Sequence, residues 1–108
     1  MKEEIRRTVA YAAATHINGS AGSLIYSYER GRHSPMSPTH DYDSRAPVAR
    51  TAEGLYHHGT NSHVSFIVDG RAFSGYDYGS CHHYTGRVTG NTVQLFDYGE
   101  NRYFRYSV

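Results

Sequence analysis

The sequence predicts a mainly β domain in which four tandem antiparallel hairpins form a closed or strongly curved, barrel-like sheet, with one N-terminal α-helix packed on the apolar face. Two observations predict this class. A segment with paired aromatic residues before a turn recurs along the chain, and apolar and polar residues alternate with period two through the second half. Eleven Tyr and eleven Gly among 108 residues are typical of short strands joined by tight turns.

Length and composition limit the alternatives. A chain of 108 residues suits a single domain over 1–108, and a net charge of +1 gives no general attraction to nucleic acid or to an anionic membrane. The single cysteine, Cys81, allows no intrachain disulfide and favours a reducing compartment, so we expect a cytoplasmic protein. No apolar run approaches the ~20 residues of a membrane span. Glu3 and Glu4 disfavour a signal peptide. A signal peptide stays an alternative because the AAA run resembles a cleavage site.

Residues 2–17 are predicted to form the helix. Apolar residues recur there at helical spacing, and three alanines favour the helical state. Asn18-Gly19 is a typical stop signal. Because the apolar stripe is narrow, we expect the helix to lie against a sheet or in the mouth of a barrel.

The hairpin repeats are predicted over 24–108. Four segments align with one another: IYSYERGRH, LYHHGTNSH, GYDYGSCHH and LFDYGENRY. The first gap is longer than the others because it holds a Pro-, Ser- and Asp-rich stretch. We interpret this stretch, at about 34–51, as a loop insert with a degraded strand near Tyr42.

The register follows from the turns. We place two-residue turns at Asp69-Gly70 and Gly90-Asn91. In the last two repeats, Tyr78 is expected to face His83, and Tyr98 to face Tyr103. With period two, one face then gathers Val64, Phe66, Val68, Phe73, Gly75, Tyr84, Gly86, Val88, Val93, Leu95, Phe104, Tyr106 and Val108. The other gathers His63, Ser65, Tyr76, Tyr78, His83, Thr85, Arg87, Gln94, Phe96, Tyr98, Tyr103 and Arg105.

The polar face is the first candidate for function. Clustered tyrosines offer rigid, amphipathic area at low entropic cost, which suits sugars, peptides or a protein partner. The alternative is that cross-strand Tyr–Tyr and Tyr–His pairs only stabilise the hairpins. The tyrosines proposed to bind a protein or small ligand are Tyr26, Tyr28, Tyr56, Tyr76, Tyr78, Tyr98 and Tyr103.

A metal site is the second candidate. His33, His63 and His83 stand at one repeat position, and three imidazoles are a sound donor set for zinc or a similar divalent ion. The fourth repeat has Tyr103 there, and neither HExxH nor CxxC is present. We therefore expect no cofactor and keep the metal-binding protein as an alternative.

Catalysis is the third candidate. Asp77 and Asp97 lie between the aromatics, with His82 and Arg102 across the turns, where capping carboxylates or ion pairs are the simpler explanation. Cys81 adjoins two histidines but sits at a turn tip. A small hydrolase-like enzyme stays an alternative to the expected non-enzymatic binding module. Four arginines interleaved with aromatic residues suggest binding of single-stranded nucleic acid by stacking and charge, but the net charge argues against it. These arginines are Arg71, Arg87, Arg102 and Arg105.

The repeated YDYG and the closing RYFRYSV resemble small bacterial proteins built from tandem Tyr- and Gly-rich β-hairpins. The layout from Leu24 to Val108 also resembles the fourfold β-flower architecture and, in outline, the tubby-like barrels that enclose a helix. The resemblance implies a nearly closed barrel, a hydrophobic ligand and a helix that acts as plug or lid; it implies no catalytic residues. A final strand ending at Val108 would be an exposed edge, which barrel closure or a homodimer would remove.

Overall fold

The computed structural model describes all residues 1–108 and contains one helix and eleven short strands. Helix α1 spans Glu3–Asn18, within one residue of the predicted helix at both ends. The strands are β1 (Leu24–Ser27), β2 (Arg32–Ser37), β3 (His40–Asp41), β4 (Ala46–Arg50), β5 (Gly54–His57), β6 (Ser62–Ser65), β7 (Ile67–Asp69), β8 (Ala72–Asp77), β9 (His82–Thr89), β10 (Thr92–Asp97) and β11 (Arg102–Ser107).

The strands form a closed antiparallel barrel. Their order is β6-β5-β4-β3-β2-β1-β11-β10-β9-β8-β7, and β6 also pairs with β8 through Val64 and Asp77. Because β6 and β7 are two halves of one strand interrupted at Phe66, the barrel has ten strands. The predicted barrel is confirmed. Strand β11 pairs with β1 at Tyr26 and Ser107, so the exposed edge behind the homodimer expectation is absent.

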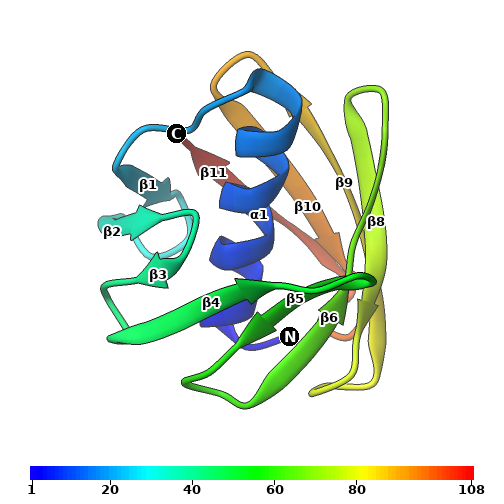
Figure 1. Cartoon of the computed structure of the whole chain (residues 1–108). Coiled ribbons are helices and arrows are strands. Elements are labelled where there is room, and N and C mark those ends of the chain that lie inside the picture. Colours follow the sequence, from blue (N-terminus) through cyan, green and yellow to red (C-terminus); the bar gives the residue numbers. More distant parts are fainter.

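Helix α1 runs through the middle of the barrel, with β1–β4 on one side of it and β8–β10 on the other (Figure 1). Ile5, Val9 and Ala13 are almost completely buried against the strands. Small alanines let the surrounding wall approach closely, which a helix of larger residues would prevent. The helix ends at Gly19, whose φ of 88° is the left-handed C-cap that the Asn-Gly signal predicts.

The barrel has five hairpins, not four. The stretch predicted as a loop insert, 34–51, contains most of β2 and all of β3 and β4. Pro35 and Pro47 lie within β2 and β4, where their carbonyl oxygens accept hydrogen bonds from the amides of Tyr42 and His58. Strand β3 pairs with each neighbour over two residues only, and the Pro, Ser and Asp content of the stretch is what made it resemble a loop.

Each of the five hairpins has a four-residue loop between paired strands. The loops are 28–31, 42–45, 58–61, 78–81 and 98–101. Each ends in a residue with positive φ, namely Gly31, Arg45, Asn61, Cys81 and Asn101. The repeat is therefore defined by backbone conformation as well as by aromatic residues.

The expected partners across these loops were wrong by two residues. Tyr76, not Tyr78, faces His83, and Phe96, not Tyr98, faces Tyr103. The loops begin one residue earlier than predicted because the preceding aspartates cap them, as described below. The turn expected at Asp69-Gly70 is Gly70-Arg71, whereas Gly90-Asn91 is as predicted.

The predicted division into two faces is confirmed because a shift of two residues preserves the face. Tyr84, Val88 and Leu95 are fully buried inside the barrel. No residue assigned to the apolar face is exposed, and none assigned to the polar face is buried. Gly86 makes room for a neighbouring ring, since a Cβ there would overlap Phe73 and lie 2.6 Å from the Gln94 carbonyl oxygen.

Candidate functional site

Groups of three aromatic rings, which we call aromatic triads, lie on the outside of the barrel near the four-residue loops. In three hairpins, one ring on the first strand meets two others edge to face: the ring of the first loop residue and a ring on the second strand. The central ring lies 4.8 Å from the ring across the loop in each triad, measured between centroids. These triads are Tyr26–Tyr28–His33, Tyr76–Tyr78–His83 and Phe96–Tyr98–Tyr103.

The other two hairpins carry parts of the same pattern. Tyr56 packs on His58 with centroids 4.8 Å apart, and His40 packs on Tyr42 at 4.5 Å. The His63 ring packs against Tyr78 of the next hairpin, with the two ring centroids 5.6 Å apart. Because the barrel closes, the aromatic clusters follow one another around its outer wall.

One part of this wall is hollowed into a groove. It lies over β7, β8 and β9 and has a volume of about 590 Å³. Ile67, Tyr76, His83 and Tyr98 line it, and the small Ser74 separates Ile67 from Tyr76. No Lys, Arg, Asp or Glu side chain lines the groove, so its polar groups are hydroxyls, imidazoles and the Cys81 thiol.

The structure distributes the predicted tyrosines between two hollows and the remaining surface. Tyr76 and Tyr98 line the groove. Tyr28 and Tyr103 line a separate hollow of about 350 Å³, beside the ion pair between Arg102 and Glu29. The tyrosines outside both hollows are Tyr26, Tyr56 and Tyr78.

The three repeat-equivalent histidines do not come together. No group of three or more His, Cys, Asp or Glu side chains is placed to hold a metal ion. His33 and His83 each pack on the tyrosine of their own hairpin, and His63 lies 3.1 Å from the Thr51 hydroxyl through its Nε2. Equivalent positions in different hairpins lie apart around the barrel, so repeat equivalence cannot gather ligands on its outer face.

A second cluster, which we call the polar ring, lies inside the barrel. It consists of the residues that end the first strand of each hairpin: Ser27, Asp41, His57, Asp77 and Asp97. All five are buried. Four of them accept a hydrogen bond from a backbone amide of the following loop, at 2.8–3.2 Å, and these are Ser27, His57, Asp77 and Asp97. The predicted role of Asp77 and Asp97 as capping carboxylates is thus present.

Two arginines of α1 reach the polar ring. Arg7 binds Asp41 through Nη2 at 2.7 Å and Nε at 3.3 Å, and Arg6 binds Asp97 at 3.2 Å. His57 and Ser44 also bind Asp41, at 3.1 and 2.7 Å. These ion pairs were not predicted from the sequence, because the expected partners of the aspartates were the residues across each turn. Their one sequence signal is the adjacent Arg6 and Arg7 in a helix that has to be buried.

The ion pairs set the protonation of these aspartates. Burial by itself would raise the pKa of Asp41, but hydrogen bonds from His57, Arg7 and Ser44 outweigh it and hold that pKa well below its ordinary value. Burial likewise opposes ionisation of Asp97. Hydrogen bonds from the Met1 amino group and the Gly99 amide nevertheless hold its pKa below the ordinary value. Both carboxyls are therefore charged groups at neutral pH.

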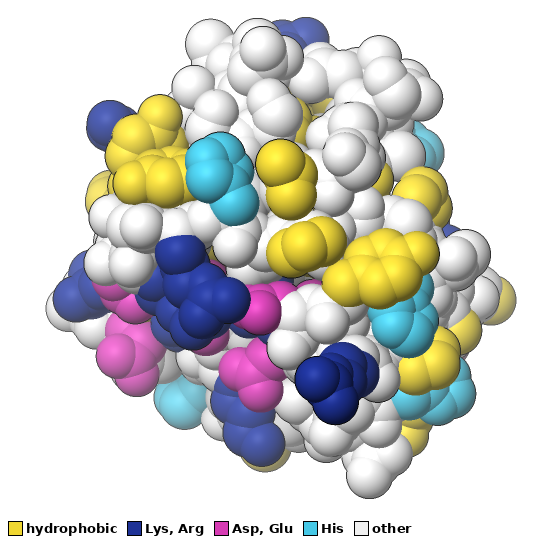
Figure 2. All heavy atoms as spheres, turned by 90° about the vertical axis from the view of Figure 1, so that its left-hand side faces the viewer, with side chains coloured by type: hydrophobic (Ala, Val, Ile, Leu, Met, Phe, Trp, Pro, Cys, Tyr) yellow, Lys and Arg dark blue, Asp and Glu magenta, His cyan; other side chains and the backbone are white.

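The charged side chains over β1–β4 mostly compensate one another. Figure 2 shows basic and acidic side chains side by side in the lower part of this face, with hydrophobic and His side chains above and beside them. Arg32 and Arg30 both lie within ion-pair distance of Asp43, at 2.8 and 3.8 Å. Opposite charges thus alternate on this face, which gives no single-sign patch for a polyanion.

The fold and site define a helix-filled barrel of five hairpins with an aromatic outer wall. No helix in it is long and apolar enough to cross a membrane. Comparison with protein-family models, curated proteins and solved structures finds no match. The groove and the polar ring are therefore the features of this molecule from which a function can be inferred.

Proposed function

We propose that this domain is a non-enzymatic binding module that takes a neutral, ring-shaped ligand such as a sugar in the groove over β7–β9. The observation that carries the proposal is the groove itself, whose volume of about 590 Å³ lies in the range of small-molecule sites, roughly 300–1,000 Å³. Its lining combines aromatic rings with hydroxyls and imidazoles and lacks full charges.

This lining matches the chemistry of a sugar. The apolar C–H faces of a sugar ring pack on aromatic rings, and its hydroxyls need neutral donors and acceptors. Tyr76 and Tyr98 offer both in one side chain, while His83 adds ring nitrogens. An anionic or cationic ligand would find no formal countercharge here, so the groove favours an uncharged one.

The Tyr76 ring in the groove is also held in one orientation by its neighbours. The central ring, Tyr76, packs edge to face on both Tyr78 and His83, which restricts its rotamers before any ligand arrives. Its backbone amide donates to the Ser65 hydroxyl at 2.8 Å, across the interruption between β6 and β7. A preorganised ring loses less entropy on binding than a mobile one.

Titration calorimetry with a panel of neutral oligosaccharides built from glucose, galactose, mannose and N-acetylglucosamine tests the proposal. Tyr76→Ala and Tyr98→Ala should each weaken binding at least tenfold, about 1.4 kcal/mol. Tyr26→Ala is the matched control, because Tyr26 has the same triad geometry outside the groove. Circular dichroism checks that every variant is folded.

Two results would count against the proposal. If no saccharide binds, or if Tyr26→Ala weakens binding as much as Tyr76→Ala, the groove is not a sugar site. A protein partner captured by the wild type and lost with the Tyr76→Ala, Tyr98→Ala double variant would instead assign the same surface to protein recognition.

A further inference from the structure

The polar ring contains one carboxylate without a cation. Its three aspartates occupy equivalent places at the ends of β3, β8 and β10. Asp41 is bound by Arg7 at 2.7 Å and Asp97 by Arg6 at 3.2 Å. Asp77 is only 1% exposed and forms no ion pair.

The hydrogen bonds to the Asp77 carboxylate come only from its own loop. One carboxylate oxygen accepts from the Gly79 amide at 3.0 Å, and the other accepts from the Ser80 hydroxyl at 2.8 Å. An ionised carboxylate has about four lone-pair sites, so two remain open. A buried charge is costly unless it is paired, and at the two equivalent positions the protein provides a guanidinium.

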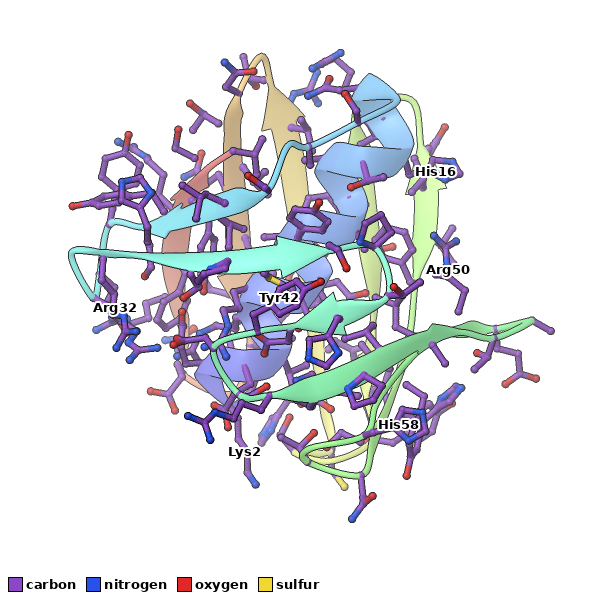
Figure 3. The ribbon with its side chains drawn as sticks, turned by 60° about the vertical axis from the view of Figure 1, so that its left-hand side comes forward. Lys2, His16, Arg32, Tyr42, Arg50 and His58 are labelled. Atoms are coloured by element: carbon purple, nitrogen blue, oxygen red, sulfur yellow. The ribbon has the colours of Figure 1, made fainter.

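A cavity of about 350 Å³ adjoins Asp77. Its other polar side chains include Thr60, Asn61 and Ser62, and Ile5 of α1 contributes an apolar wall. Lys2 also borders the cavity but is exposed, and Figure 3 shows it at the end of α1, pointing away from the barrel. Met1 borders the cavity as well, and its amino group is bound to Asp97 at 3.0 Å. The cavity therefore combines one carboxylate that has no cationic partner, hydroxyl and amide side chains on its walls, and space for a ligand.

We propose that this cavity binds a small organic cation whose guanidinium or primary ammonium group pairs with Asp77. The ligand takes the place that Arg7 and Arg6 hold at the two equivalent aspartates. Its remaining N–H groups donate to the hydroxyl oxygens of Thr60 and Ser62. A volume near the lower limit for ligand sites restricts the ligand to a small molecule or a single side chain. The site lies inside the barrel end and is separate from the outer groove.

The test is an NMR titration of the ¹⁵N-labelled wild-type chain with methylguanidinium chloride. The Gly79 and Ser80 amides are the reporters, since both belong to the loop that Asp77 caps. Tetramethylammonium chloride at equal ionic strength is the control, because it carries the same charge without an N–H donor. We expect saturable shifts with methylguanidinium at millimolar concentration and none with tetramethylammonium.

Asp77→Asn keeps the shape of the side chain and an acceptor for the Gly79 amide, and it should weaken methylguanidinium binding at least tenfold. If this variant does not fold, nuclear Overhauser contacts between the ligand methyl group and the Ile5 methyl groups locate the ligand in the wild type. A second titration, with N-acetyl-arginine methylamide, shows whether the natural ligand is a peptide or a free small molecule. Binding tighter than that of methylguanidinium indicates an arginine side chain of a peptide, and weaker binding indicates a free organic cation.

Four results would overturn the inference. Three of them are the absence of saturable shifts, equal shifts with tetramethylammonium, and Overhauser contacts only to residues outside the cavity. Unchanged affinity in a folded Asp77→Asn variant would do the same.

Discussion

The ion pair between Arg7 and Asp41 allows a quantitative prediction. The exposed fractions of the two side chains are 3% and 0%, and the guanidinium contacts the carboxylate through two nitrogens. Arg7→Met would leave Asp41 charged and buried with only His57 and Ser44 as partners. Asp41→Asn would leave a buried guanidinium whose remaining carboxylate, Asp43, is 3.8 Å away.

Breaking a buried pair from one side costs about 3–5 kcal/mol, because the remaining charge has lost its partner. Each single variant should therefore lose at least about 3 kcal/mol of unfolding free energy. The stability of a domain is roughly 5–15 kcal/mol, so most of the margin disappears. The Arg7→Met, Asp41→Asn double variant removes both charges, and it should recover at least about 2 kcal/mol relative to the sum of the single losses.

Urea unfolding, followed by circular dichroism, measures all four members of this cycle. Arg32→Met is the matched control: Arg32 lies 2.8 Å from Asp43, but half of its side chain is exposed. Exposed pairs contribute about 0–1 kcal/mol, so this variant should stay within that range. If Arg7→Met costs no more than Arg32→Met, or if the single losses are additive, the buried pair is not the energetic unit described here.

Three further predictions concern residues in the interior of the barrel. Because the folded pKa values of Asp41 and Asp97 are lowered, their stabilisation is complete above the unfolded pKa of about 3.9 and falls as pH drops below it. The urea midpoint should decline from pH 5 to pH 3, and a constant midpoint would contradict this. Burial raises the pKa of Tyr84 and Tyr106, so stability should fall above pH 10, and ultraviolet titration should show a class of phenols that ionises only on unfolding. Ionisation of all eleven tyrosines in one step, with the fold intact, would refute it. Gly86→Ala should cost about 1–3 kcal/mol in urea unfolding through overlap with the opposing ring, and a neutral result would mean that the ring can move aside.

The alternation of side chains predicted the faces of the sheet because one face is buried along every strand. Phe73, Val88 and Leu95 could be assigned to the interior without knowledge of the loops. A register error of two residues left these assignments intact, since the side-chain period is two. The partners of Tyr78 and Tyr98 were wrong for the same reason, because the pattern does not distinguish registers that differ by two.

Other features depended on contacts that no local pattern contains. The β3–β4 hairpin was not predicted because Pro35 and Pro47, which lie in β2 and β4, made this stretch resemble a loop. The polar ring was missed because its members combine with α1, which is distant in sequence. The groove is formed where β6 gives way to β7, and the alternating pattern contains no sign of that interruption.

The polar ring also explains how one helix finds one orientation inside a repetitive barrel. Five similar hairpins present similar apolar walls, so the hydrophobic stripe of α1 could pack at several rotations with little change in buried area. The ring reduces this equivalence because three of its five members are carboxylates, whereas the other two are Ser27 and His57. Arg7 and Arg6 pair with Asp41 and Asp97 in the observed rotation, and a rotation that places either arginine at Ser27 or His57 would remove its aspartate partner. Asp77 forms no ion pair in the observed rotation, so its carboxylate is the one that the helix leaves without a guanidinium.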